Sequence, residues 1–506
     1  APILGRSKSI YCTPYSNECL VEVGDRVNVE ILSWGTCNHD IHGKILENFG
    51  NISDLSKDIT SILAENNITI STENLSLVNT ENIEYSNLED LFTYSIENKD
   101  ILYSLYKEGT IYNLFIHLPN ISRVSGFENI YKQQKFFHRS INFINDKVNI
   151  LPENIINSLS FNDKSNQAIT LKYSIDEEFL EIISINIFYS NVIKNKHFDN
   201  LEEVKKYNSN ELQHMMTLIT TSINKYNIPN TKIFNYPKPI INFNNTSSIY
   251  FKYSDKIDIN TFNLILQHIM IIYFKNSNVI YTEEPVIETA INIENTKTQC
   301  NKNIYTMLDN LEQVENNFSN TFDIKTNLNS ILMSKYKYTC YSTTNNKSNK
   351  KDVIHYISLF TPLENYISLL NLNMLVNSDK NKYGELENIC YKANKIEKII
   401  SKIELDYINL QKLRYYSYLE NISSNIFTVV ITKIKPYALF FIHLDTLYED
   451  SIHVSNLGGK RYNYNTINNM LTSTDNLVTF QVNQELTLKI EKIDIVKCEI
   501  KWIYKN

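Results

Sequence analysis

Strand-type alternation of apolar residues at both ends of the chain, with helical spacing between them, restricts the possible folds more than any other feature. Near the N-terminus, the apolar residues on one face of a predicted strand pair are Val21, Val23, Val27, Val29 and Ile31. Gly24-Asp25 provides a turn signal between the strands. Residues 425–506 return to the same alternation. We therefore expect part of a small β-barrel at residues 1–50 and a second barrel at 425–506.

The middle of the chain mixes strands and helices without a regular βαβ alternation. Two predicted strands cover residues 111–118 and 168–175. Apolar residues at three- and four-residue spacing predict helices, which cover residues 51–90 in part (with Ser53 as N-cap), 208–228, 260–274 and, as two packed helices, 387–422. The pattern is that of an α+β protein.

A specific turn lies in the segment YISLFTPLENY, residues 356–366. Thr361 and Pro362 predict the turn, which then presents Glu364 and Asn365. Neither of these two side chains offers an evident chemistry by itself, so the purpose of the turn is open at this point.

Composition and charge exclude several classes of protein. Of the 506 residues, 42% are hydrophobic and 21% charged, as in ordinary soluble globular proteins. A net charge of -7 argues against bulk attraction to nucleic acid, although it permits a local basic channel. Seven scattered cysteines indicate reduced thiols, and no apolar run is long enough to span a membrane. We expect an intracellular protein, cytoplasmic or organellar, which starts at Ala1 as a mature or trimmed form.

Metal-ligating residues are present, but their spacing is weak. The segment CNHDIH brings Cys37, His39 and His42 close to Cys12 and Cys19, yet the spacing matches no common zinc finger. Two acids of one segment, Glu97 and Asp100, could begin a carboxylate site, but such acids are more often solvated. The sequence also has no glycine-rich phosphate loop and no Gly-x-Ser-x-Gly elbow. We therefore predict no metal and no cofactor.

Four central segments have counterparts, in the same order, in one enzyme family. NLFIHLPNISRVSG (113–126) resembles V-H-I-A-D-V-S, and residues 141–176 are similar to the run S-V-Y-L-P through M-L-P-E and the following strand. NELQHMMTLITTSINKY (210–226) resembles the helix E-E-F-M-L-x-A-N, and residues 356–366 resemble Y-T-H-F-T-S-P-I-R-R-Y. These are motifs of the ribonuclease II/R exoribonuclease family, which has the RNB fold.

The resemblance extends to both ends of the chain. Residues 21–50 resemble the end of a cold-shock barrel, and FFIHL followed by IHVSNL (440–457) resembles an S-one-type RNA-binding barrel. It implies an RNB-like catalytic-type domain flanked by OB-fold β-barrels. The implied division of the chain is 1–50 as the end of a cold-shock-type barrel, 51–90 as a helical linker, 91–424 as the RNB-like domain and 425–506 as the C-terminal barrel.

The carboxylates of the family's metal site are missing here. The resemblance implies four acids that hold Mg²⁺, in a segment that is SIENKDILYSLYK (95–107) in this chain. Glu97 replaces the first acid, and the positions of the other three hold Tyr103, Leu105 and Tyr106. One glutamate with a displaced Asp100 is a poor set of ligands for an octahedral ion.

The phosphate-binding residues of the family are missing as well. Glu364 and Asn365 replace its tandem arginines, so an acid would face the RNA backbone. Pro119-Asn120 replaces the Ala-Asp of the strand motif, and Asn142 replaces a tyrosine, with Phe143 adjacent. The loss of both the metal ligands and the phosphate clamp predicts an inactive site.

Three hypotheses follow from the resemblance and its departures. The first is a catalytically inactive RNB protein that binds single-stranded RNA or acts within a ribonucleoprotein or RNA-processing complex. The second is a structural scaffold subunit without its own RNA binding. The third is an active 3′–5′ exoribonuclease with an altered metal site. The predicted RNA-binding residues are Phe143, Tyr356, Tyr366, Phe440 and His453.

Overall fold

The structure is a computed structural model. The residues that it describes are 10–14, 21–34, 41–68, 75–78, 83–132, 137–144, 146–178, 181–199, 203–204, 239–242, 248–251, 259–275, 277–285, 338–344, 353–377, 385–422, 426–443, 446, 448–459, 461–466, 468–475 and 477–505. The predicted helix at 208–228 lies outside them.

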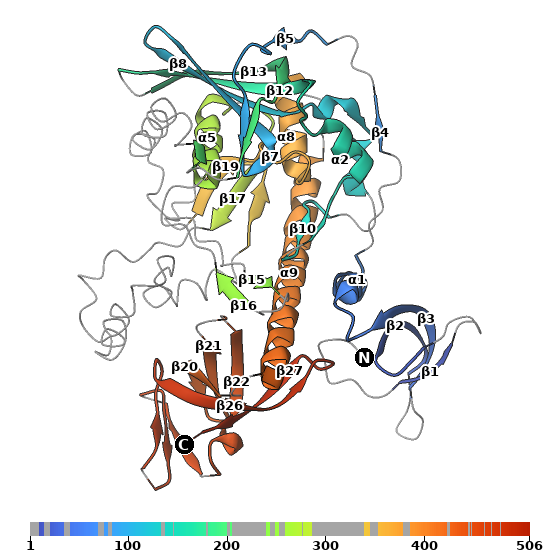
Figure 1. The fold of residues 1–506 in the computed structure, drawn as a ribbon, viewed down its shortest axis with the longest axis vertical. Coiled ribbons are helices and arrows are strands. Elements are labelled where there is room, and N and C mark those ends of the chain that lie inside the picture. The colour runs from blue at the N-terminus through green and yellow to red at the C-terminus, as the bar shows by residue number, and fades with distance from the viewer. Residues whose placement is uncertain are drawn as a thin grey trace.

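A seven-stranded sheet forms the upper part of the molecule (Figure 1). In spatial order its strands are β14 (Lys196–Phe198), β6 (Tyr94–Ile96), β7 (Asn98–Glu108), β8 (Ile111–Pro119), β12 (Ser165–Asp176), β13 (Glu181–Ile193) and β5 (Ser86–Asn87). The four long central strands pair antiparallel, and β8 pairs with β12 from Pro119 opposite Ala168 to Ile111 opposite Asp176. These two strands confirm the predictions for 111–118 and 168–175.

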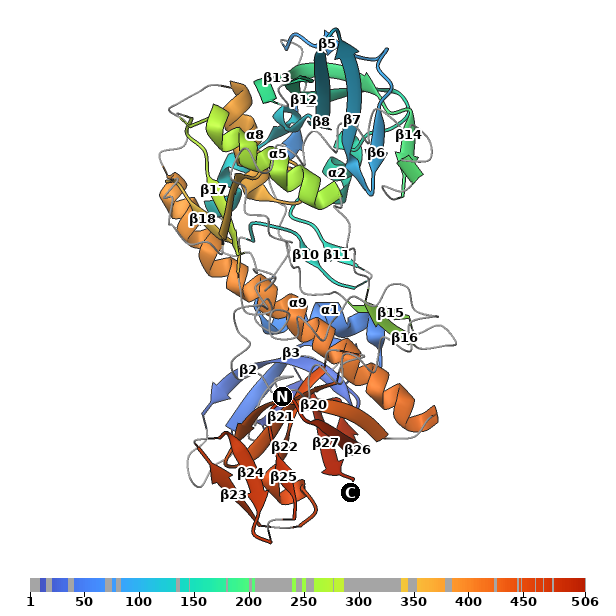
Figure 2. The ribbon, with the colours of Figure 1, turned by 90° about the vertical axis from the view of Figure 1, so that its left-hand side faces the viewer.

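One face of this sheet carries the main hydrophobic core. Alternation along β7 places Tyr103 in this core, whereas Leu102 belongs to a small cluster on the other face. Helix α5 (Ile259–Tyr273), predicted at 260–274, lies beside the sheet (Figure 2). Its residue Phe262 belongs to the main core. Helix α8 (Tyr366–Asn377) contributes to the same core, and α2 (Glu153–Leu159) packs its apolar residues into it.

A row of fully buried polar side chains crosses the central strands of the sheet. His117 of β8 contacts Ser104 of β7 through Nε2 (3.0 Å) and Thr170 of β12 through Nδ1 (2.7 Å). Ser104 continues to Thr93 (2.8 Å), and Thr170 continues to Ser190 of β13 (2.5 Å). All five residues have 0% exposure, so they satisfy one another's hydrogen bonds without water at their side chains.

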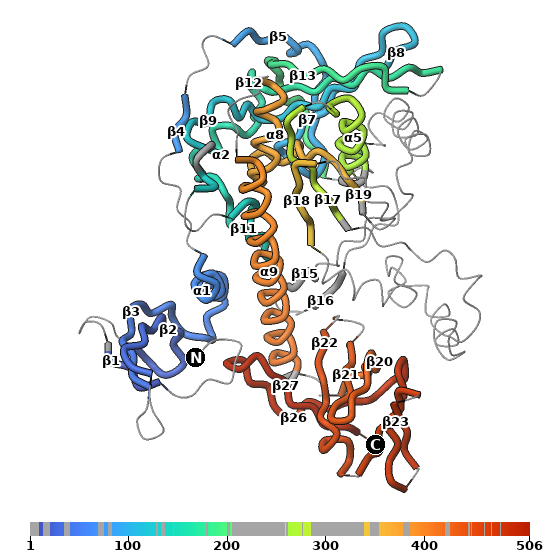
Figure 3. The backbone as a smooth tube through the Cα atoms, turned by 180° about the vertical axis from the view of Figure 1, so that it is seen from behind, coloured from blue at the N-terminus to red at the C-terminus, as the bar shows by residue number. Residues whose placement is uncertain are grey.

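Several short strands complete the central region. Three of them form a sheet in the order β18 (Cys340–Ser342), β17 (Tyr281–Pro285) and β19 (Val353–Ile357). The remaining pairs are β10 (Ile141–Asn142) with β11 (Lys147–Val148), β15 (Pro239–Asn242) with β16 (Ser248–Phe251), and β4 (Ser76–Leu77) with β9 (Val124–Ser125), the last visible in Figure 3.

The prediction of two packed helices at 387–422 is wrong, because the segment is one continuous helix, α9 (Leu386–Ile422). It contains no glycine or proline that would break it. Its 37 residues correspond to a length of about 55 Å. The first part of the helix, up to Leu410, packs into the main core, whereas Leu413 and Tyr416 pack into the C-terminal core. A single helix therefore supplies apolar side chains to two cores. Figure 1 shows α9 running from the central region down to the C-terminal sheets.

The N-terminal and C-terminal sheets lie toward the lower end of α9 (Figures 1 and 2). The N-terminal sheet has the order β1 (Ile10–Pro14), β3 (Ile41–Asn51), β2 (Asp25–Ser33). The C-terminal strands form one sheet, β22 (Tyr448–His453), β21 (Ala438–His443), β20 (Ile426–Lys435), β26 (Glu485–Asp494), β27 (Glu499–Tyr504), and another, β23 (Tyr462–Asn465), β24 (Met470–Ser473), β25 (Thr479–Phe480).

The predicted barrels at both ends are open in the part of the chain that the structure describes. Its strands form sheets and no closed barrel at either end. The division of the chain at residues 50, 90 and 424 stays a prediction, because α9 takes part in both the main and the C-terminal core.

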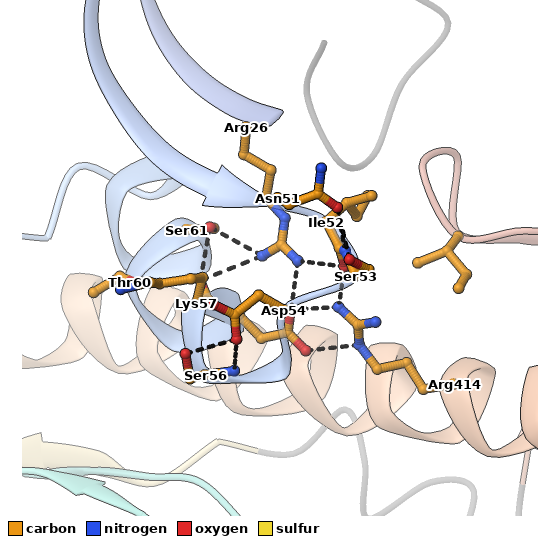
Figure 4. Close-up of polar contacts among 12 residues, drawn as sticks. Arg26, Asn51, Ile52, Ser53, Asp54, Ser56, Lys57, Thr60, Ser61 and Arg414 are labelled. Carbon is orange, nitrogen blue, oxygen red and sulfur yellow. Dashed lines mark hydrogen bonds and ion pairs between the residues drawn. The ribbon is translucent and has the colours of Figure 1, made fainter. Parts of the chain in front are cut away.

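One buried carboxylate connects the N-terminal sheet to α9 through helix α1 (Asp58–Glu65). Figure 4 shows Arg26 of β2 and Arg414 of α9 converging on the start of α1. Asp58, with 0% exposure, accepts from both guanidinium groups and from Gln411 Nε2 (2.9 Å). The Ile52 carbonyl accepts from the same two arginines at 3.1 and 2.7 Å. Helix α1 is therefore held between the sheet and the long helix.

The prediction of Ser53 as the cap of this helix is wrong. Ser53 instead donates from its backbone and its hydroxyl to Asn51 Oδ1, at 3.0 and 2.7 Å. Asp54 caps a short 3₁₀ turn by accepting from the Ser56 backbone N–H at 2.9 Å, and α1 begins only after that turn, at Asp58. The 3₁₀ turn displaces the start of the helix along the chain.

Among the described helices, none combines the length and the apolar character that a membrane crossing requires.

Candidate functional site

A lysine and two carboxylates from three segments share one region of the central domain. Lys147 Nζ of β11 forms an ion pair with Glu364 of the turn that precedes α8. Asp100 of β7 accepts a hydrogen bond of 3.0 Å from the hydroxyl of Ser160, which directly follows α2. The charges of both Glu364 and Lys147 act on Asp100. This region is the candidate site.

The turn that presents Glu364 is held from two sides. The predicted Thr-Pro turn is confirmed, because the backbone N–H groups of Glu364 and Asn365 both donate to the Thr361 carbonyl, at 3.1 and 2.9 Å. Asn365 forms an isolated antiparallel bridge with Arg139, and the Ser140 N–H donates to the Glu364 carbonyl at 2.7 Å. The segment that leads into β10 therefore lies directly beside the turn.

The hairpin of β10 and β11 brings the lysine to this turn. Asn142 lies directly opposite Lys147 in the ladder, and Ile141 lies opposite Val148. Because Ser140, at the start of the hairpin, bonds to Glu364, the far strand has its lysine within reach of the same residue. Asn142, where the resemblance implies a tyrosine, is thus paired with the lysine of the site.

The carboxyl of Asp100 is electrostatically perturbed. Burial raises its pKa, and the nearby negative charge of Glu364 acts in the same direction. The hydrogen bond from Ser160 and the positive charges of Lys147 and Lys194 oppose the rise. Asp100 is half-buried, so its ionised form depends on these partners for stabilisation.

The four positions assigned from the resemblance to the lost acids do not converge. Glu97 is exposed at the tight connection between β6 and β7, with a φ of +58°. Tyr103 is 2% exposed and donates from its hydroxyl to Asn263 Oδ1 of α5 at 2.9 Å, while Leu105 packs beside the main core. Tyr106 is 50% exposed on the opposite face of the strand. Of the two acids of this segment that the sequence singled out, Asp100 is the one whose pKa responds to the charges of Lys147 and Glu364.

The residues of the candidate site do not fit a Mg²⁺ ion. Such an ion needs several oxygen ligands in near-octahedral geometry. Asp100 and Glu364 supply carboxylates, but the ammonium of Lys147 is already paired with Glu364. Within the described part of the chain, no group of three or more His, Cys, Asp or Glu side chains converges in a way that could hold a metal ion.

A partly buried arginine clamp beside the site was missed at the sequence level. Arg139 donates from Nε and Nη2 to both oxygens of Glu397 (2.9 and 3.0 Å), and from Nη1 and Nη2 to both oxygens of Glu404 (2.8 and 3.1 Å). The two glutamates lie seven residues apart, on one face of α9. That spacing was the only signal in the sequence, and it does not identify the arginine partner.

The Glu397 carboxylate of this clamp is held in its ionised form. Burial opposes ionisation of Glu397, but hydrogen bonds from His138 and Arg139 and the charge of Arg139 lower its pKa. Burial lowers the pKa of His138 itself, so this histidine acts on Glu397 mainly as a hydrogen-bond donor. His138 Nε2 lies 2.9 Å from Glu397 Oε2 and 3.1 Å from the Tyr341 hydroxyl. The clamp therefore fixes the 138–142 segment, and with it the hairpin that carries Lys147, against α9.

Two of the predicted RNA-binding aromatics lie in the core. Phe143 is 7% exposed, with its ring centroid 4.8 Å from that of Tyr407 in an edge-on contact. Tyr366 has 0% exposure at the start of α8. A base needs an open ring face for stacking, so burial argues against this role for either residue. Their apolar packing explains the positions instead.

The other three predicted residues are accessible to different degrees. Tyr356 of β19 is half-buried, and its hydroxyl donates to Glu284 Oε2 at 3.1 Å. Phe440 is half-buried on β21, and His453 is exposed at the end of β22. Ala438 lies directly opposite His453 in the ladder, so Phe440, two residues along β21, is on the same face of the sheet as His453.

The zinc candidates are only partly described. Cys19, Cys37 and His39 lie outside the described residues. Cys12 and His42 are exposed on neighbouring strands β1 and β3. The described residues therefore do not test the zinc hypothesis, and the absence of a metal there stays a prediction.

The central sheet with its covering helices and the long helix α9 define the RNB fold of RNase R. A scan against protein-family models and a search of curated proteins found no match. Mycoplasma genitalium RNase R in complex with ribose-methylated single-stranded RNA superposes with a TM-score of 0.74 at 17% identity, over 98% of this chain and 85% of that chain.

Two further solved structures are similar over most of this chain. Yeast Ssd1, described as a pseudonuclease, has a TM-score of 0.61 at 13% identity and matches 88% of this chain and 61% of its own. The Dss1 exoribonuclease from Candida glabrata has a TM-score of 0.59 at 10% identity and matches 84% and 55%. The fold is thus found both in exoribonucleases and in a pseudonuclease.

Proposed function

We propose that this chain is an RNB-family protein that binds single-stranded RNA without hydrolysing it. The observation that carries the proposal is the ion pair between Lys147 and Glu364 beside Asp100. Glu364 stands where the resemblance implies a phosphate-binding arginine, and its pairing with Lys147 supports the loss of that phosphate contact. The described residues also contain no group of three or more His, Cys, Asp or Glu side chains that could hold a metal ion. Lys147, Glu364 and Asp100 therefore favour a structural role over metal-dependent hydrolysis of RNA.

The comparisons support the RNA-binding part of the proposal at the level of fold. Mycoplasma genitalium RNase R has been solved with single-stranded and with double-stranded RNA. The presence of a pseudonuclease among the similar structures supports the idea that this fold persists without catalysis. On this proposal, RNA stacks on the C-terminal sheet through Phe440 and His453, with Tyr356 as a further contact in the central domain.

The decisive experiment separates binding from hydrolysis. The full chain is incubated with a 5′-labelled single-stranded RNA with and without Mg²⁺ or Mn²⁺, and the same RNA is used in a mobility-shift titration at physiological salt. We expect a shifted RNA of unchanged length. Shortening from the 3′ end that requires the metal would reject the inactive site in favour of an altered nuclease. Intact RNA with no shift would favour the scaffold role.

A further inference from the structure

The solvent-facing side of the first half of α9 has a distinct composition. Between residues 391 and 402 the exposed residues are Tyr391, Lys395, Lys398 and Lys402, and every other residue of this stretch is buried or half-buried. Spacings of four, three and four residues place all four side chains on one side of the helix. These four residues are called the α9 stripe.

The fold separates the acids of this part of α9 from its lysines. Glu397 and Glu404 point toward Arg139, with side-chain exposures of only 5% and 16%, and its guanidinium compensates their charge. Two further acids, Glu387 and Asp406, lie one helical turn beyond either end of the stripe. Solvent therefore meets three ammonium groups within the stripe and no carboxylate, although the sequence of the helix mixes both signs.

The lysines of the stripe have no internal counter-charge. Lys107 pairs with Glu177, and Lys392, on the flank of α9, donates to the Tyr131 carbonyl at 2.9 Å. By contrast, none of the three stripe lysines forms an ion pair or a side-chain hydrogen bond with another residue in the described part of the chain. Like charges three and four residues apart destabilise a helix. A local cost without an internal compensation is typical of a functional surface.

We propose that the α9 stripe binds the phosphate backbone of single-stranded RNA. This inference rests on the proposed function and adds to it a second surface, on a different element from Phe440 and His453. It also supplies a phosphate contact, since Glu364 and Asn365 stand where the resemblance implies phosphate-binding arginines. The net charge of -7 disfavours RNA binding over the whole surface, so a local group of lysines is needed for such a contact.

The dimensions and the chemistry of the stripe fit a nucleic-acid strand. The three lysines span about 10 Å of helix axis, and a stacked strand has one phosphate per about 3.4 Å, so the stripe matches about three phosphates. Tyr391, with 69% exposure, offers an open ring at one end on which a base can stack. Regularly spaced cations beside an open ring fit a polyanion that carries bases better than an acidic protein segment.

The test is the salt dependence of RNA affinity. The full chain is titrated with a labelled oligouridine over a range of KCl concentrations. The triple variant Lys395→Gln, Lys398→Gln, Lys402→Gln is expected to reduce the slope of log affinity against log salt by about 2, because each phosphate contact on a single strand contributes about 0.7. It is expected to bind about tenfold or more weakly at physiological salt. Arginine at the same three positions is expected to preserve the slope, and Tyr391→Ala to weaken binding without changing it.

A matched control changes the net charge by the same amount at other places. Lys107→Gln, Lys164→Gln, Lys275→Gln removes three exposed lysines from three other segments and is expected to leave the slope unchanged. Glutamine has nearly the helix propensity of lysine, so α9 is expected to persist in the stripe variant. Should circular dichroism show a loss of helix, the single variant Lys398→Gln, with an expected slope change of about 0.7, takes its place.

The outcomes distinguish this inference from the proposed function. An unchanged slope in the stripe variant, or an equal reduction in the control, would overturn the inference and leave RNA binding by the chain intact. An unchanged slope together with a loss of polyglutamate binding would assign the stripe to an acidic protein instead. Absence of RNA binding by the unmodified protein would overturn both the inference and the proposed function.

Discussion

Arg414 holds both oxygens of the Asp58 carboxylate, with Nε 2.8 Å from Oδ2 and Nη2 2.6 Å from Oδ1. The pair joins the start of α1 to the second half of α9, and Arg26 adds β2 at 2.6 Å from Oδ1. Two buried guanidinium groups thus depend on one buried carboxylate, which makes the contact sensitive to any loss of charge.

Replacing Asp58 with Asn is expected to destabilise the attachment of the N-terminal sheet. The substitution keeps the shape but leaves Arg26 and Arg414 as uncompensated buried charges, for which a cost of about 3–5 kcal/mol is usual. Urea unfolding and limited proteolysis measure the effect, and we expect cleavage near the N-terminus first. Asp54→Asn, at an exposed cap of the 3₁₀ turn, is the control. Equal stability of the two variants would contradict the role of Asp58.

The buried polar row fixes the tautomer of His117. Thr93 donates to the Leu91 carbonyl at 3.0 Å, so its hydroxyl must accept from Ser104. Ser104 in turn must accept from His117 Nε2–H, which leaves Nδ1 to accept from Thr170. We therefore expect the ¹⁵N spectrum of His117 to show a protonated Nε2 and a bare Nδ1. A protonated Nδ1 would contradict the direction of the chain of bonds.

The same histidine is expected to weaken the fold in mild acid. Burial lowers the pKa of His117 to about 3, whereas the unfolded chain titrates near the ordinary value of 6.5. Between these values the unfolded state binds more protons than the folded state, so stability falls as the pH drops below 6.5. From pH 7 to pH 5 this one group accounts for about 2 kcal/mol. Urea unfolding of the protein and of His117→Gln measures it, and a difference independent of pH would refute it.

Asp450 is expected to lower the stability of the protein as the pH rises, the opposite of the effect of His117. Burial raises its pKa to about 6, although Trp502 Nε1 donates to it at 2.8 Å. The folded state then binds more protons than the unfolded state between pH 4 and 6, so this contribution to stability is lost as the pH rises through 6. Asp450→Asn is expected to stabilise the protein by about 1–3 kcal/mol at pH 8, with a smaller effect at pH 4.5. The same gain at both pH values would show that ionisation is not the cause.

The aromatic face of the C-terminal sheet gives a prediction for RNA affinity. Phe440 and His453 share that face, and base stacking on an aromatic ring contributes about 1–3 kcal/mol per base. The double variant Phe440→Ala, His453→Ala is expected to bind single-stranded RNA about tenfold or more weakly in a mobility-shift titration. Tyr437→Ala, which removes an exposed aromatic side chain three residues before Phe440, is the control. Unchanged affinity of the double variant would place the RNA elsewhere.

Local patterns predicted much of the fold correctly. Strands β8 and β12 follow from alternation, and the Thr361-Pro362 turn follows from its residue types. The prediction of two helices in residues 387–422 was wrong, because the apolar residues of the single helix α9 pack into two different cores. A change of packing partner along one helix resembles a break in the periodicity. Sequence alone does not distinguish the two.

The candidate site was harder to predict from the sequence than the fold. The loss of acids and arginines was visible as residue types, but counting positions assigned Tyr103 and Tyr106 to one site, and they lie on opposite faces of β7. The pairing of Lys147 with Glu364 depends on the packing of a hairpin against a distant turn. No local pattern in either segment indicates such a partner.

The continuity of helix α9 also fixes the rotation of the C-terminal sheet relative to the central sheet. A continuous helix turns by about 100° and advances about 1.5 Å with each residue, so one inserted residue would rotate the C-terminal sheet away from its present direction. Insertions of seven residues, close to two full turns, would preserve the orientation and change only the separation. The angle between the central sheet and the C-terminal sheet therefore depends on the number of residues between Leu410 and Leu413, as well as on the side chains that pack there.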